Sequence, residues 1–263
     1  MNWKKIFQVI LPLMLIIVLA FKANAYVYTD DFKSGHYWKS FPIGMNRFIA
    51  DQSEGPLLEE VTRLAEEQWE NAVGKNLWDF ASVTVNTSNQ GNHIRWSNNF
   101  GADTGYDQTR TLAVTIRYAS GTYLERVVII LNGSMPQLKQ DWGGTLRKTV
   151  LHEMGHVVGL DHSSESSIMA AYISDFSTLQ QDDINGINAV VNETLYRQAI
   201  GYVAPSSAEN KSSNTSILSG CGTIETNDKS GNGPGGFIFS LGIGILCSIV
   251  LNRIKYKNRK NFL

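Results

Sequence analysis

Three histidines and one glutamate lie within eleven consecutive residues of this chain. His152 and His156 are four residues apart, so on a helix they would share one face and could bind one metal ion together. Glu153 would project from an adjoining direction, close enough to reach a water on that ion without coordinating the metal. A straight helix could not bring His162 to the same point. Gly159 can adopt the positive φ that ends a helix and turns the chain back.

Three neutral imidazoles with one open coordination position are typical of a catalytic zinc site. The alternative is that paired helical histidines are simply half-buried side chains with satisfied nitrogens. The complete pattern H-E-x-x-H-x-x-G-x-x-H disfavours that alternative, because it holds three of the chain's five histidines. We therefore predict that zinc lowers the pKa of its bound water and that Glu153 acts as general base on this water.

The pattern is the signature of the metzincin metallopeptidases, and the surrounding residues resemble the matrixin (matrix-metalloproteinase-like) branch, in a bacterial form. Ser163 follows the third histidine, as in matrixins. Met169 lies where the family places its Met-turn, a packed floor beneath the zinc. Leu179–Ile187 is similar to the start of the family's C-terminal helix. The resemblance implies an α+β, zincin-like catalytic domain, whose twisted five-stranded, mostly parallel sheet has one antiparallel edge strand and is joined by three helices.

The same resemblance implies how a substrate binds. The strand 127–131 would be the antiparallel edge strand above the cleft, where Val127, Ile129 and Leu131 would hold an extended peptide by main-chain hydrogen bonds. No partner other than a protein or peptide substrate is implied at this cleft.

Two further residues are candidates for the specificity pocket. Lys148 matches a matrixin position that influences pocket depth, although an exposed helix lysine is the alternative reading. Tyr172 follows the Met-turn, one residue from the position where some metzincins place a tyrosine ligand. The proline that is common after the Met-turn methionine is absent here.

Local patterns outline the elements that must position these residues. Helical spacing covers residues 56–73, between Pro56 and Gly74, and returns at 144–158. Alternating or β-rich runs predict strands at 42–49, 78–85, 93–96, 112–118 and 127–131. One helix, several strands and a second helix with polar chemistry indicate a mixed α/β domain.

The two ends of the chain predict export and a membrane anchor. Residues 1–25 have the basic start, apolar centre and Ala23-Asn24-Ala25 end of a signal peptide, with a permanent anchor as the alternative. An apolar run at 235–251 precedes a basic cytoplasmic tail at 252–263. This end also resembles glycine-glycine sorting signals that a membrane protease cleaves, which would leave the protein at the cell surface or secreted.

The remaining organisation follows from composition. Residues 26–200 are long enough for one catalytic domain, and the segment 201–234, rich in Ser, Asn and Gly, predicts a flexible low-complexity stalk containing Cys221. The net charge of the whole chain is −1, and its basic residues gather at both ends. The middle is therefore acidic, which excludes a nucleic-acid partner.

Other metal sites receive less support. The segment 101–107 could offer oxygens to Ca²⁺, although a plain polar turn is the alternative. A second, structural zinc is not predicted, because only His36 and His93 remain outside the motif. No cysteine precedes His152 to hold the enzyme latent.

These observations predict an exported, membrane-tethered zinc endopeptidase that hydrolyses extended proteins or peptides. The alternative is a non-catalytic surface binding or adhesion protein that retains a structural zinc. Glu153 discriminates between the two, since a structural site has no use for a base beside an open coordination position.

Overall fold

The structure, a computed structural model, describes residues 26–85, 90–163, 166–205 and 216–224. The predicted signal peptide (1–25), apolar segment (235–251) and basic tail (252–263) lie outside these residues. Within the described ranges, no helix is both long enough and apolar enough to span a bilayer.

The predicted helices and strands are present, with small shifts at their ends. The helices are α2 (Asp30–Lys33), α3 (Gly55–Val73), α4 (Phe100–Thr104), α5 (Pro136–Lys139), α6 (Thr145–Val158) and α7 (Gln181–Ile200). The strands are β1 (Val27–Tyr28), β2 (Tyr37–Trp38), β3 (Ile43–Ile49), β4 (Trp78–Val85), β5 (His93–Ser97), β6 (Thr111–Ser120), β7 (Tyr123–Asn132), β8 (Leu160–Asp161) and β9 (Ser216–Ile224).

The large sheet has the strand order β4-β3-β5-β7-β6-β9. Strands β4, β3, β5 and β7 are mutually parallel, whereas β6 runs antiparallel to β7. The predicted five-stranded α+β sheet with one antiparallel strand is therefore confirmed. Two strands add to it: β2 pairs with the beginning of β7, and β9 pairs with the outer side of β6.

The prediction that 127–131 forms the edge strand is wrong. These residues belong to β7, which pairs with β5 on one side and β6 on the other, so its main chain has no free edge. The side chains of Val127, Ile129 and Leu131 are fully buried in the core. The two strands form a hairpin of similar apolar character, and only the pairing order shows that β6 is the antiparallel member.

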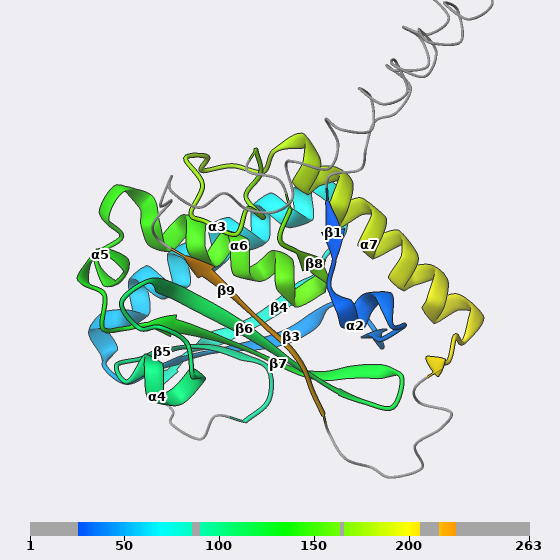
Figure 1. Cartoon of the computed structure of the whole chain (residues 1–263), viewed down its shortest axis with the longest axis horizontal. Coiled ribbons are helices and arrows are strands. Elements are labelled where there is room, and N and C mark those ends of the chain that lie inside the picture. The colour runs from blue at the N-terminus through cyan, green and yellow to red at the C-terminus, as the bar shows by residue number, and fades with distance from the viewer. Residues whose placement is uncertain (1–25, 86–89, 164–165, 206–215, 225–263) are drawn as a thin grey trace, which may run out of the picture. The chain divides into compact units, whose positions relative to one another are not determined.

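Three long helices cover one face of the sheet (Figure 1). Helix α3 begins with a proline in its first turn and ends at Gly74, whose φ of 64° only glycine adopts readily. Its apolar side buries Leu58, Val61 and Trp69, and the Trp69 indole donates to the Leu151 carbonyl of α6 at 2.9 Å. This contact fixes α6, the helix that carries the histidine motif, against α3.

The strand β9 lies inside the segment predicted as a flexible stalk. It pairs antiparallel with β6 over nearly the whole length of that strand, from Ala119↔Ser216 to Thr111↔Ile224. Cys221 falls opposite Thr115 in this register. The rest of the 201–234 segment, and the domain boundaries drawn from it, stay predictions.

Candidate metal centre

The turn after α6 brings the third histidine to the other two. The helix ends at Val158, and Gly159 has φ 123°. This positive φ favours glycine, and a Cβ here would lie 3.1 Å from the Phe32 ring, which would have to shift to accept it. The chain then forms β8, which pairs with β1 and leads directly into His162.

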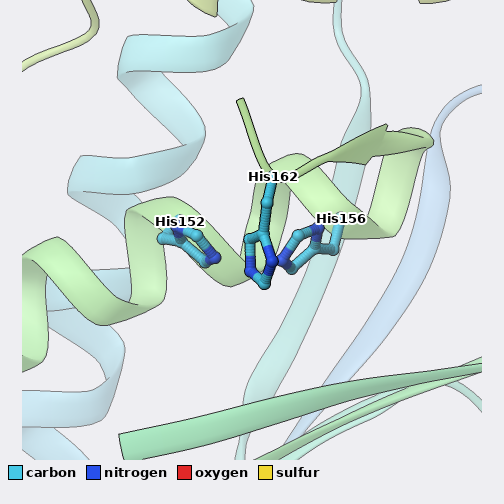
Figure 2. A group of neighbouring side chains, drawn as sticks. All are labelled: His152, His156 and His162. Carbon is cyan, nitrogen blue, oxygen red and sulfur yellow. The ribbon is translucent and has the colours of Figure 1, made fainter. Parts of the chain in front are cut away.

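The three imidazoles converge on one point (Figure 2). Their ring centroids are 4.6 to 5.2 Å apart, and one nitrogen from each lies within 4.8 Å of the others. His152 and His156 are buried, and His162 is half-buried. The Nε2 atoms of all three lack hydrogen-bond partners. Among the described residues, this is the one group of three or more His, Cys, Asp or Glu side chains that could hold a metal.

The electrostatics of the cluster favour neutral rings. Burial, with a smaller contribution from His162, lowers the pKa of His152 to about 3. Burial likewise lowers the pKa of His156 well below its usual value, and that of His162 in the same direction. A neutral imidazole has a free lone pair, which is the form that binds a metal. Three such nitrogens, buried and otherwise unpartnered, fit zinc.

The opposite ring nitrogens are held by backbone carbonyls. His152 Nδ1 lies 2.7 Å from the Ile168 carbonyl oxygen, and His156 Nδ1 lies 2.7 Å from that of Leu160. A ring whose Nδ1–H donates to a carbonyl presents Nε2 as the lone-pair nitrogen. These contacts therefore fix both the tautomer and the orientation of the two rings.

The Met-turn is fastened by a residue that sequence reasoning missed. Buried Asp183, in the first turn of α7, accepts hydrogen bonds from the backbone amides of Ile168 and Met169 at 2.9 and 3.1 Å. The same carboxylate accepts from the Gln180 amide at 2.8 Å and closes the capping box of α7. Asp183 thus holds the carbonyl that orients His152. Its signal in the sequence was the Gln180-x-x-Asp183 capping pattern.

Met169 is buried against α6 and packs beside a glycine of the histidine motif. A Cβ on Gly155 would lie 2.3 Å from the Met169 sulfur. A larger residue at this position would therefore force the methionine away from the helix that carries His152 and His156. Gly155 was not singled out from the sequence, because its effect depends on this contact across the fold.

The strand β6 supplies a partner for Glu153. The Thr115 hydroxyl donates to the Glu153 carboxylate at 2.6 Å, and both side chains are buried. Two residues further along β6, buried Arg117 donates to the His156 carbonyl and pairs with Asp31 of α2. Alternate residues of β6 thus face α6, and neither contact was predicted from the sequence.

The two predicted pocket residues take no part in the contacts described above. Lys148 is half-buried and lines a cavity of about 230 Å³ between α3 and α6, together with Gln68 and Ser177. Tyr172 is 36 % exposed after the Met-turn. A role for either residue in substrate binding stays a prediction.

The acidic side chains of the 101–107 segment already have partners. Asp103 accepts hydrogen bonds from Ser97 and Arg95, and Asp107 accepts from Thr109. Asp103 lies in α4 and Asp107 follows this helix, and both carboxylates are held by protein groups. Calcium binding there stays a prediction that the geometry does not favour.

This fold and this site define the metzincin class of metallopeptidases. The family model for matrixin matches residues 65–192, which run from α3 through the histidine motif to α7. This match supports a matrixin-type metzincin, as the motif predicted, and a matrixin domain implies a zinc endopeptidase. A sequence search among curated proteins finds no match to the chain.

Proposed function

We propose that this protein is a zinc-dependent endopeptidase in which Glu153 is the general base and extended segments of proteins or peptides are the substrates. The observation that carries the proposal is the placement of Glu153. Its carboxylate is buried, it follows a metal ligand on the same helix, and Thr115 holds it from the sheet. A structural metal site would gain nothing from a buried carboxylate in this position.

The residues of the site have distinct roles. His152, His156 and His162 would hold zinc, which when bound acidifies a water and polarises a carbonyl. Glu153 would accept the proton of the attacking water on its carboxylate and pass it to the departing amine. Thr115 donates to one oxygen of this carboxylate and so orients the base from the sheet. The Asp183 contacts keep the Met-turn and His152 in place while this occurs.

We propose further that the domain acts outside the cytoplasm, tethered by its C-terminal segment or released when a sorting protease cuts there. This rests on the sequence patterns of residues 1–25 and 235–263. Fractionation of cells that produce the full chain, with protease accessibility of the domain, tests it. A domain that stays soluble in the cytoplasm would refute export.

The test of the catalytic role is Glu153→Gln in the full chain, with Glu59→Gln on the exposed side of α3 as the matched control. Both proteins are assayed on a mixed peptide library by mass spectrometry, and bound zinc is quantified. We expect cleavage by the native chain and the control, and a loss of about 10²–10⁴-fold in kcat for Glu153→Gln at unchanged zinc. Stoichiometric zinc without cleavage by any of the three would favour the non-catalytic binding protein.

A further inference from the structure

The outer edge of β6 is the part of the sheet closest to the reacting groups. Thr115, in the middle of this strand, contacts Glu153, and Arg117 contacts the carbonyl of His156. Apart from β9, no described strand pairs with this side of β6. An extended peptide that added a strand here would pass beside Glu153, and main-chain pairing with a free sheet edge is a general way to hold such peptides.

This edge is occupied by the chain itself. Strand β9 pairs antiparallel with β6, with Gly220, Cys221 and Gly222 opposite Ile116, Thr115 and Val114, respectively. It also contacts α6, which carries His152 and His156, and the short helix α2. The segment therefore lies where a bound peptide would have to lie.

The tether makes this pairing intramolecular and easy to form. Before the segment, the Ala204 amide donates to the Thr122 hydroxyl at 3.2 Å, in the turn between β6 and β7. The segment returns at Ser216, which pairs with Ala119 next to that same turn. Ten residues separate Pro205 from Ser216. Because one chain connects these neighbouring points, the pairing is intramolecular and competes well with a separate peptide at low concentration.

The composition of β9 makes it a weak strand. Gly220 and Gly222 lie at its centre, and each interior glycine weakens a strand because it loses more backbone freedom and packs no side chain. A weak strand that belongs to the same chain can pair with the outer edge of β6 and still be displaced by another peptide.

The resemblance to matrixins places the substrate on the antiparallel edge strand, which in this chain is β6. We propose that Ser216–Ile224 is an intramolecular occupant of this edge, so that a substrate binds only by displacing β9. This rests on the proposed function and would supply the restraint that no upstream cysteine provides. Its action is competitive: occupancy raises the apparent KM and leaves kcat unchanged.

The test disrupts β9 by Ser219→Pro together with Gly220→Pro in the full chain. Consecutive amides of a strand point to opposite sides, so one of the two prolines removes an N–H that faces β6. The matched control is Ser212→Pro with Ser213→Pro, in the tether outside the strand. The readouts are hydrogen exchange of the β6 amides, KM and kcat on a peptide found by the library screen, and binding of that peptide to the same variants carrying Glu153→Gln.

We expect the β9 variant to lose amide protection along β6 and to lower the apparent KM about 10-fold, with kcat unchanged. This is the factor for an occupant that fills the edge about nine-tenths of the time. The peptide should bind the Glu153→Gln form of the β9 variant about 10-fold more tightly than that of the native chain, and binding should restore protection in β6. The control should behave as the native chain does.

Several results would overturn the inference. Loss of β6 protection with unchanged KM and peptide affinity would show that the edge is not the binding site. An effect that depends on protein concentration would assign the occupant to a second copy, and cleavage of the native chain within 216–224 would make the segment a substrate instead of a competitor. Failure of the proposed function looks different, since no peptide would then be cut by any variant, while hydrogen exchange of the β6 amides would still report on β9.

Discussion

Two buried histidines show what distinguishes a candidate metal ligand from a structural residue. His93 in β5 is fully buried, its Nδ1 lies 2.9 Å from the Gly91 carbonyl oxygen, and its Nε2 has no hydrogen-bond partner. His152 in α6 shares all three properties, at 2.7 Å from the Ile168 carbonyl. The difference is what each ring faces. His93 stacks on Phe48 at 4.9 Å, whereas His152 faces His156 and His162. Convergence, and not burial, makes the metal site.

Removing one histidine from each region tests directly which of them binds zinc. We expect His156→Ala to abolish measurable cleavage. We expect its zinc affinity to fall by more than the ~10–100-fold that follows loss of a hydrogen-bond partner of a metal ligand. His93→Ala should keep one zinc per chain, because its ring faces an apolar neighbour. Zinc titration with a competing chelator measures both variants. Equal zinc loss in the two would mean that the cluster is not the binding site.

A smaller effect is expected from the residue that holds the Met-turn. Asp183→Asn replaces a carboxylate that accepts three backbone amides with a group whose NH₂ cannot accept them, so the turn and the carbonyl that orients His152 would shift. We expect zinc affinity to fall about 10–100-fold. Asp182→Asn, the half-buried neighbour, is the control. Unchanged affinity in both would show that His152 is oriented without the turn.

Next comes the contact between the sheet and the base. Thr115→Val keeps the shape of the side chain but removes the hydroxyl that donates to Glu153. A hydrogen bond to a charged group contributes about 1.5–3 kcal/mol, so we expect kcat to fall roughly 10-fold or more at unchanged zinc and KM. Thr115→Ser keeps the hydroxyl and should retain most of the activity. If the Val variant keeps as much activity as the Ser variant, the hydroxyl is not needed by the base.

The smallest effect concerns His93 and acid stability. Burial lowers the pKa of His93 below its usual value of 6.5. Below pH 6.5, His93 therefore binds a proton in the unfolded chain but stays neutral in the folded chain. Stability is therefore complete above about pH 6.5 and falls as pH falls. We expect His93→Gln to reduce the loss of unfolding free energy between pH 7 and pH 5 by about 1 kcal/mol. Urea titrations at the two pH values measure this, and parallel losses would contradict it.

The sequence was sufficient for what local spacing controls. The i, i+4 histidines and the turn at Gly159 are properties of one helix and its end, and the 3.6- and 2-residue periods placed the main helices and strands. Contacts between distant segments were missed. Thr115, Arg117 and Asp183 act through partners 14 to 86 residues away, and nothing in their own surroundings indicates those partners.

The error over the edge strand has the same origin. Both strands of the β6–β7 hairpin are apolar, so periodicity cannot decide which one lies between two neighbours. The strand β9 was missed because Ser and Gly residues predict a linker. Pairing with β6 overrides that local preference, and such an override depends on the tertiary structure.

The short strand β1 has a consequence for how the N-terminus must be made. Val27 and Tyr28 pair with Asp161 and Leu160, the residues immediately before His162. A leader removed after Ala25, as proposed, leaves this pair of residues intact with one residue to spare. Trimming by only a few residues more would delete the strand against which the last metal ligand is aligned. The position of leader cleavage could thus vary very little. The first residue of each molecule would decide whether β1 forms and, with it, whether His162 is held for zinc binding.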